Sequence, residues 1–413
     1  MHVRHLTTTV AAVAGLAVTL TACGGGDDDS TSTAGGPLQL YTWVSSQSDR
    51  EQWESFVAEA QKEDPDLDIT IEGPSFEDYW TKVKTRLSGD DTPCLLTTQA
   101  ARAQELDSLL MPLDDLVEEH DFDLSQVDES MLEGMTVDGT LRAIPYDAEP
   151  VVLFYNVDAF TAAGLTPPGP EYSREQFLAD ATALTTDDHK ALAVTPGMFI
   201  PAAWATAGDT SWLDGDGGLD LTNPDFVGQI QDYFDLVAAE GIADAPNAAD
   251  GADVAQEAFT SGGVDMLIEG PWMYGTFDEA ADFTLGVTIV PSPSGQAHGM
   301  TAGSGFGIAA NCDRPDEAFE AIVALTSTGV QESLAASRGI VPARAEALPA
   351  WAEGKSPGAA DVVTALLGNA TAQVTTPTWN QVETLMTQYS VEGYRGERSA
   401  EEIMGTIQDS VGG

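Results

Sequence analysis

The stretch that decides the fold begins with Leu38-Gln-Leu-Tyr-Thr-Trp-Val44, whose alternating, β-rich residues predict a strand. After this strand, the spacing of apolar residues predicts a helix over 49–62, a strand over 67–71, a helix over 76–87 and a strand over 95–98. The first helix is expected to use Ser48 or Asp49 as its N-terminal cap. Strands and helices that alternate in this way are typical of a mainly parallel sheet with helices on both faces. The sequence therefore predicts an α/β fold.

The rest of the chain continues this mixture of elements. Strands are predicted over 141–146, 151–155, 285–290 and 305–309, and the clearest later helix runs over 226–237. The C-terminal quarter is predicted to be mostly helical. The chain is too long for one comfortable core, so two domains are expected.

The N-terminal residues predict where the protein is located. Arg4, an apolar run over 10–20 and then Leu20-Thr-Ala-Cys23 form the pattern of a secretory signal over 1–22, too short to span a membrane. The end of this signal resembles a bacterial lipobox, in which Cys23 is lipidated; the alternative is an ordinary signal cleaved nearby. Residues 23–36 have the composition of a flexible tether. We therefore expect an extracytoplasmic protein, anchored to the outer face of the cell membrane by Cys23.

The charge of the chain excludes some partners. A formal net charge of -51, from 67 acidic and 16 basic side chains, argues against nucleic acid and against a basic contact with anionic lipid. Beyond Cys23 no segment approaches the ~20 apolar residues of a transmembrane helix, so the lipid would be the only link to the membrane. The acidic side chains are spread along the chain, which favours a solvated surface over a site for cationic ligands.

Motifs of common enzyme classes are missing from the sequence. It contains no Gly-x-Ser-x-Gly elbow, no His-Glu-x-x-His, no Walker loop and no Cys-x-x-Cys. His120, His189 and His298 are isolated from one another in the sequence, so we expect neither a metal nor a cofactor. A glycosidase with paired carboxylates stays an alternative, although any acidic chain carries such pairs. We expect a protein that is not an enzyme.

A series of short blocks then points to a family. In chain order they are Leu87-Ser-Gly-Asp-Asp-Thr-Pro93, Asp138-Gly-Thr-Leu-Arg-Ala-Ile-Pro145, Leu153-Phe-Tyr-Asn-Val-Asp158, Phe259-Thr-Ser-Gly-Gly-Val-Asp-Met-Leu-Ile-Glu-Gly-Pro-Trp272 and Gly339-Ile-Val-Pro342. Together they resemble the extracellular solute-binding proteins of ATP-driven carbohydrate importers, a group that includes maltodextrin-binding proteins. Leu141, Ala143 and Asp265 depart from the usual residues of the family. Each block alone is weak evidence for the family, but together, in the family's order, the blocks cover nearly the whole mature chain.

The resemblance implies a two-lobed periplasmic-binding-protein fold of type II, the Venus-flytrap arrangement, with a mainly parallel sheet flanked by helices in each lobe. Each lobe would be built from two parts of the chain, namely 37–148 with 303–348 for the N-terminal lobe and 149–302 with 349–413 for the C-terminal lobe. The chain would cross between the lobes at 147–150, at 291–303 and near Leu348. Short crossings permit the bending that closes two lobes on a ligand.

The same resemblance implies the function and the partners. The protein would be a monomeric binding lipoprotein that captures a sugar or oligosaccharide between its lobes and delivers it to the permease subunits of an ABC importer. Two alternatives stay open. One is a secreted hydrolase that acts on polysaccharide, and the other is the same binding fold with a polyamine or peptide ligand.

A sugar site needs flat aromatic side chains under the ring faces and planar polar groups at the hydroxyl rim. Tyr155, Trp272 and Trp379 align with positions where the maltodextrin-binding relatives stack aromatic rings on sugar. Trp43 is added because ligands bind beyond the carboxyl ends of strands. The candidates for the hydroxyl rim are Gln99, Arg102, Asp147, Glu149, Ser45 and Ser46, with backbone N–H groups from Gly303, Ser304 and Gly305.

With Cys23 assigned to lipid, Cys94 and Cys312 form an even pair in an oxidising compartment. In the related fold, the strands that follow Cys94 and precede Cys312 lie side by side and antiparallel in the N-terminal lobe. The resemblance therefore implies a Cys94–Cys312 disulfide.

Overall fold

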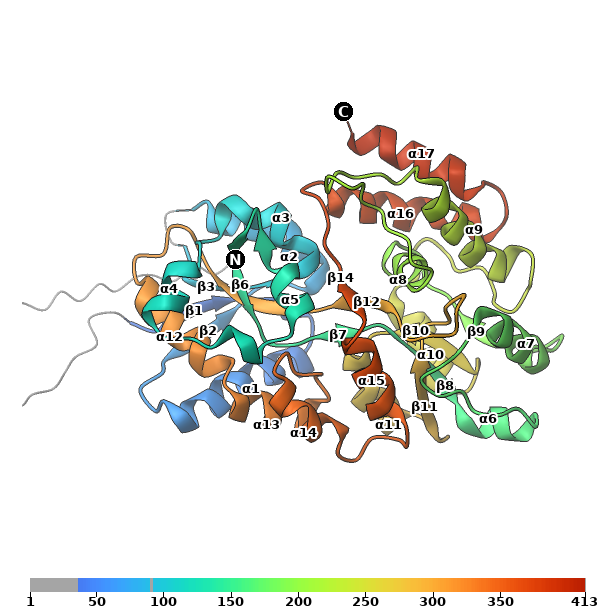
Figure 1. Cartoon of the computed structure of the whole chain (residues 1–413), viewed down its shortest axis with the longest axis horizontal. Helices are drawn as coiled ribbons and strands as arrows, with labels where there is room; N and C mark the ends of the chain where they lie inside the picture. Colours follow the sequence, from blue (N-terminus) through green and yellow to red (C-terminus); the bar gives the residue numbers. More distant parts are fainter. Residues whose placement is uncertain (1–35, 90–91, 413) are drawn as a thin grey trace, which may run out of the picture. The chain divides into compact units, whose positions relative to one another are not determined.

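The structure, a computed structural model, describes residues 36–89 and 92–412, and one of its two lobes is built on a five-stranded sheet (Figure 1). We call this the first lobe. β1 pairs in parallel with β2 and β3, whereas β13 is antiparallel to both of its neighbours. In sheet order the strands are β2 (Ile69–Glu72), β1 (Leu38–Tyr41), β3 (Leu95–Gln99), β13 (Ser304–Ile308) and β6 (Ala143–Pro145). The chain therefore leaves this sheet and returns to it much later.

Helices bury the apolar residues of this sheet in two clusters. In the larger cluster, α1 (Gln47–Glu63) contributes Trp53 and Phe56, and α12 (Pro315–Leu325) contributes Phe319. In the smaller one, α2 (Phe76–Leu87) packs Tyr79 and Trp80 with residues of β1 and β3. The other elements of this lobe are η1 (Ala100–Arg102), α3 (Ala103–Leu106), η2 (Asp107–Leu109), α4 (Asp114–Glu119), η3 (Leu124–Gln126), α5 (Glu129–Gly134), the hairpin of β4 (Thr136–Val137) and β5 (Thr140–Leu141), and α13 (Thr328–Arg338).

A disulfide joins the outgoing and the returning parts of the first lobe. Cys94 immediately precedes β3, and Cys312 follows β13, which is the antiparallel neighbour of β3. The two cysteines are 218 positions apart in sequence, yet their Cα atoms are 4.8 Å apart and their sulfurs are bonded. The disulfide implied by the family resemblance is confirmed.

The second lobe is built on a four-stranded sheet. β8 is antiparallel to both of its neighbours, and β10 runs parallel to β9. The strand order is β11 (Leu285–Ile289), β8 (Val152–Asn156), β10 (Met266–Glu269) and β9 (Leu192–Ala193). Its helices are α6 (Val157–Ala162), α7 (Arg174–Leu184), α8 (Phe199–Ala207), α9 (Pro224–Ala238), α10 (Ala252–Thr260), η4 (Pro271–Met273), α11 (Tyr274–Ala280), α15 (Ala359–Leu367), α16 (Trp379–Tyr394) and α17 (Ala400–Val411).

A separate three-stranded sheet lies between the two lobes (Figure 1). We call it the crossing sheet. It consists of β14 (Ala370–Ala372), β12 (Gly299–Ala302) and β7 (Glu149–Pro150), with β12 parallel to β14 and antiparallel to β7. The strands β7 and β12 fall in the two segments where the first crossings are expected. Leu348, near the third expected crossing, follows η5 (Ala345–Ala347) and begins α14 (Leu348–Ala352), whose Trp351 is buried in the second-lobe core. The lobe boundaries stay predictions.

Two local expectations need correction. The sheets are mixed rather than mainly parallel, because β13 returns antiparallel beside β3 and because β8 is antiparallel to both of its neighbours. Helix α1 begins earlier than predicted, and its cap is Ser46, whose Oγ accepts a hydrogen bond from the backbone N–H of Asp49 at 3.1 Å. Ser48 and Asp49 therefore lie inside the helix.

The signal over 1–22, the lipidated Cys23 and the tether up to residue 35 lie outside the described residues. Within the part of the chain that the structure describes, no helix has the length and apolar character to cross a membrane.

Candidate functional site

The first lobe presents a partly exposed aromatic cluster at the end of β1. Trp43 is half-buried, and its ring lies 5.3 Å from that of Phe76 and 5.9 Å from that of Trp80, measured between centroids. Phe76 is 39% exposed, which is unusual for a large apolar side chain in this structure. Its exposure follows from its place as the first residue of α2, where no turn precedes it. The sequence analysis names Trp43 as a candidate and does not name Phe76.

Ser45 and Ser46 belong to the starts of two helices. The backbone N–H of Ser45 donates to the Asp49 carboxylate at 2.8 Å, and the Ser45 Oγ accepts the backbone N–H of Phe76 at 2.9 Å. Ser46 caps α1. Both residues are exposed, but their hydroxyl oxygens already accept backbone N–H groups at the starts of the two helices. The first N–H groups of a helix have no partner within the helix and need such acceptors.

Trp272 lies in the second lobe, in the turn η4 that follows β10. Its indole rests on the backbone of Gly270, because a Cβ at that position would come within 2.0 Å of Cζ3 of the indole. The ring of Phe199, at the start of α8, lies 6.0 Å away between centroids. Trp272 is half-buried, so glycine supports the ring while part of it stays accessible. An aromatic ring held in this way is suited to stack on the apolar face of a ligand.

The other two aromatic candidates are buried in the second-lobe core. Tyr155 is 6% exposed, its hydroxyl donates to the carbonyl of Pro168 at 3.1 Å, and burial raises its pKa to about 12. Trp379 is fully buried, with the ring of Trp212 5.3 Å away. Its helix repeats apolar residues at Val382 and Met386, the spacing of a core-facing stripe. Neither ring offers a free face to a ligand in this structure.

Four of the rim candidates meet where β3 lies beside the start of β13. Gln99 is paired with Ser304 in the sheet, and its amide donates to the Ser304 Oγ at 3.5 Å. The backbone N–H of Ser304 donates to the Asp147 carboxylate. Gly303 accepts the N–H of Ala100 on its carbonyl oxygen at 3.1 Å, and a Cβ there would lie 2.5 Å from Cε of Met131. The residues 303–305 are buried and paired within the protein, so their glycines permit close packing rather than close approach of a ligand.

Asp147 and Glu149 place two buried carboxyl groups at the crossing sheet. Asp147 is 8% exposed and Glu149 2%. Burial raises the pKa of Asp147 to about 8, and burial together with the charge of Asp147 raises the pKa of Glu149 well above its ordinary value. Glu149 accepts the backbone N–H of Val341 on Oε1, while its Oε2 has no hydrogen-bond partner among the described residues. An unsatisfied buried acceptor of this kind is costly unless a ligand or water completes it.

The raised pKa of Asp147 predicts a pH dependence of stability. An acid whose folded pKa lies above its unfolded value of about 4 stabilises the folded state at low pH and loses that contribution as pH rises towards 8. Asp147→Asn keeps an oxygen that can accept from the N–H of Ser304 but does not ionise. We expect the variant to gain stability relative to the unmodified chain between pH 5 and pH 8, measured as urea-unfolding midpoints at both values. An equal pH dependence in the two proteins would contradict this assignment.

Arg102, the remaining rim candidate, is buried in an ion-pair network. Its guanidinium group contacts the carboxylate of Glu383 on α16 and lies 3.5 Å from that of Glu105, measured from Nη1 to Oε2. It also sits over the ring of Trp80, with Cζ 4.9 Å from the ring centroid. The sequence did not single out Glu383, because its partner lies 281 positions earlier in the chain.

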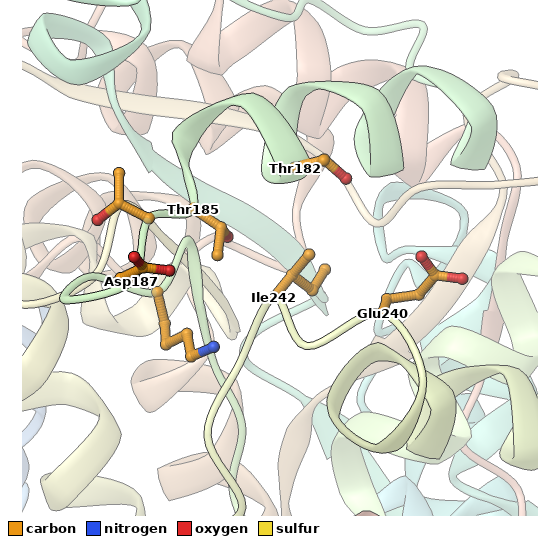
Figure 2. A pocket seen from close by; sticks show the side chains of 7 residues that line it. Thr182, Thr185, Asp187, Glu240 and Ile242 are labelled. Atoms are coloured by element: carbon orange, nitrogen blue, oxygen red, sulfur yellow. The ribbon is translucent and has the colours of Figure 1, made fainter.

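A polar pocket of about 390 Å³ lies elsewhere, on the second lobe (Figure 2). It is lined by Thr182, Thr185, Thr186, Asp187, Lys190, Glu240 and Ile242, and no candidate site residue contributes to it. The Lys190 ammonium is partly engaged, since it donates to the carbonyl of Gly241 at 2.7 Å.

A metal site finds no support among the described residues. The one group of potential ligands in that part of the chain is formed by Cys94, Cys312 and Asp313. Two of its three atoms are the sulfurs of the disulfide, which cannot act as thiolates.

Comparison with known proteins gives the family. The family model described as bacterial extracellular solute-binding protein matches residues 45–332. No curated protein sequence matches the chain. Solved structures with the same fold include the ABC substrate-binding protein from Listeria monocytogenes in complex with cycloalternan (TM-score 0.80, 19% identity, 91% of this chain and 98% of that chain). The GacH receptor of Streptomyces glaucescens, solved without ligand and with acarbose, gives a TM-score of 0.77 at 21% identity, over 91% of this chain and 97% of that chain.

A third similar structure is UgpB from Mycobacterium tuberculosis in complex with glycerophosphocholine (TM-score 0.78, 20% identity, 92% of this chain and 98% of that chain). At these identities the structures establish a shared fold. The family model spans most of the chain, and it agrees with the two-lobed architecture and with the sequence blocks. The chain belongs to the family of bacterial extracellular solute-binding proteins.

Proposed function

We propose that this protein captures a sugar or oligosaccharide between its two lobes and delivers it to the permease subunits of an ABC importer. Membership of a solute-binding family makes it a binding protein rather than an enzyme. Cycloalternan and acarbose, the carbohydrate ligands named for two proteins of the same fold, support the choice of ligand class. The lipobox and the tether support a protein held to the outer face of the membrane through lipidated Cys23.

The observation that carries the ligand class is the support of Trp272 by Gly270. This contact holds an accessible indole at the end of a strand in the second lobe, and Trp43 with Phe76 forms an aromatic surface in the first. Flat aromatic surfaces match the C–H faces of sugar rings. The proposed site also takes polar groups for the hydroxyls from the rim candidates that lie near the crossing sheet or the lobe interface, namely Gln99, Arg102, Asp147 and Glu149.

A thermal-shift screen of residues 37–413 tests this function. The panel contains maltotriose, acarbose, smaller sugars, polyamines, peptides and glycerophosphodiesters. A ligand that binds only the folded state adds about 2.7 kcal/mol at a hundred times its dissociation constant, which a melting curve resolves. A shift with a sugar that is recovered intact would support the proposal. A shift with a polyamine or peptide alone would overturn the sugar assignment, and degradation products would favour a hydrolase.

Two substitutions test the aromatic platform with the sugar that the screen identifies. Trp272→Ala is expected to weaken binding by about tenfold to a hundredfold, in the range of a central tryptophan in an interface. Gly270→Ala should also weaken binding, because the new methyl group would displace the indole. The measurement is isothermal titration calorimetry. Gly228→Ala, on α9 with nothing within 4 Å of its added Cβ, is the matched control and should bind normally. Unchanged affinity in both platform variants would remove Trp272 from the site.

A further inference from the structure

Arg102 is anchored firmly in the first lobe. It ends η1, directly after β3 of the five-stranded sheet, and it is 5% exposed. The ring of Trp80 lies under its guanidinium group, and Glu105 one turn later contributes a second carboxylate. Glu105 in turn pairs with Lys84. These neighbours all belong to α2 and α3, so the side chain of Arg102 is held by contacts within the first lobe.

Glu383 is anchored equally firmly in the second lobe. It lies on α16, whose Trp379, Val382 and Met386 are buried in the core of that lobe. The indole Nε1 of Trp379 donates to Oε1 of Glu383 at 3.0 Å, which holds the carboxylate and leaves Oε2 for Arg102. The Arg102–Glu383 ion pair therefore joins two lobes that are built on different sheets.

The low solvent exposure of this ion pair makes its interaction stronger than that of a surface pair. The side chains of Arg102 and Glu383 are 6% and 27% exposed, so water screens the pair less than it screens a surface pair. Breaking one end leaves a charge in a poorly solvated place. The guanidinium group is also not saturated, because its Nε and Nη1 are buried without hydrogen-bond partners among the described residues. The nearby Trp80 Nε1 is a further buried donor without a partner there. Arg102 can thus donate hydrogen bonds to further acceptor groups, in addition to Glu383 or in its place.

We propose that the Arg102–Glu383 ion pair is a latch that holds the two lobes together in the ligand-free protein, and that a bound ligand replaces Glu383 at Arg102. This inference rests on the proposed function, since Arg102 is one of the proposed ligand contacts. Glu383 then acts as an internal competitor, because its carboxylate occupies the donors that the acceptor oxygens of a ligand need. The latch sets how readily the empty protein opens and how much of the binding energy of a ligand is used to displace it.

Small-angle X-ray scattering of ligand-free residues 37–413 tests the latch without any knowledge of the ligand. Glu383→Gln should increase the radius of gyration and the maximum dimension, because a neutral amide holds Arg102 less tightly. Glu392→Gln is the matched control. Glu392 lies on the same helix, and its Oε2 is 3.1 Å from Nη1 of Arg398 within the second lobe. The scattering of this variant should equal that of the unmodified domain. Equal scattering for Glu383→Gln, with its fold verified by circular dichroism, would sink the proposal.

Substitution at the other end of the pair separates a latch from a purely structural ion pair. Arg102→Gln should open the lobes as Glu383→Gln does. The effects on affinity should be opposite, because Glu383→Gln removes a competitor and Arg102→Gln removes a ligand contact. For the sugar found in the screen, we expect Glu383→Gln to bind it about fivefold more tightly or better. We expect Arg102→Gln to bind it more weakly. Weaker sugar binding in both variants would contradict the proposed competition between Glu383 and the ligand. If no sugar binds, the proposed function fails, whereas the scattering still decides the latch.

Discussion

Replacing Cys94 and Cys312 together by alanine is expected to lower the free energy of unfolding by about 2–5 kcal/mol. The bridge closes a loop of 218 positions, for which the loss of entropy in the unfolded chain alone amounts to about 5 kcal/mol. It lies at the ends of β3 and β13, which already pair from Leu95 to Gln99, so its removal leaves the folded structure with little to readjust. Urea unfolding followed by tryptophan fluorescence measures the loss.

The unmodified domain in a reducing agent is the control for this variant. Its stability should fall by a similar amount, because the same covalent link is broken without a change of sequence. Sugar affinity should be nearly unchanged, since neither cysteine lies in the proposed site. A loss of stability below about 1 kcal/mol in both samples would show that the loop is constrained by the paired strands even in the unfolded ensemble.

Trp379→Ala is expected to cost about 3–5 kcal/mol of unfolding free energy, the range for removing a fully buried tryptophan. The substitution leaves a cavity beside Trp212 and deprives Glu383 of the indole that donates to it. Trp272→Ala, at a half-buried ring, should cost much less stability and far more affinity. Thermal and urea unfolding of the two variants, beside their sugar affinities, distinguish a core tryptophan from a ligand platform.

A milder variant guards against a simple failure to fold. Trp379→Phe keeps most of the apolar volume and loses the hydrogen bond to Glu383, for a cost of about 1–2 kcal/mol. If Trp379→Ala were as stable as the unmodified domain but lost its ligand, the assignment of this ring to the core would be wrong.

The predictions that succeeded from sequence depend on local periodicity. The 3.6-residue repeat predicts a helix over 49–62, and the structure places α1 there with Trp53 and Phe56 on its buried face. The bounds of α2, Phe76–Leu87, agree with the predicted range. The start of α1 was misplaced by a few residues, because Ser46, Ser48 and Asp49 are all acceptable caps and only the path of the chain selects one.

The parts of the candidate site that the sequence did not indicate depend on contacts between residues far apart in the chain. The motif Gly-Pro-Trp correctly marked a corner, and there the accessible Trp272 lies on Gly270. Trp379 had no comparable local context, and its helical spacing with Val382 predicts a core position better than a ligand contact. Glu383 carries no local signal at all, because its contact with Arg102 forms only when the fold brings the two lobes together.

The disulfide also changes what a cut in the chain would do. Every residue between Cys94 and Cys312, including all four strands of the second-lobe sheet, belongs to one covalent ring. A single proteolytic cleavage in any loop of that ring cannot release a fragment, because the two pieces stay joined through sulfur. Outside the cell, where thiols are oxidised, a nicked molecule would therefore stay whole, and only a gel run after reduction would reveal the break.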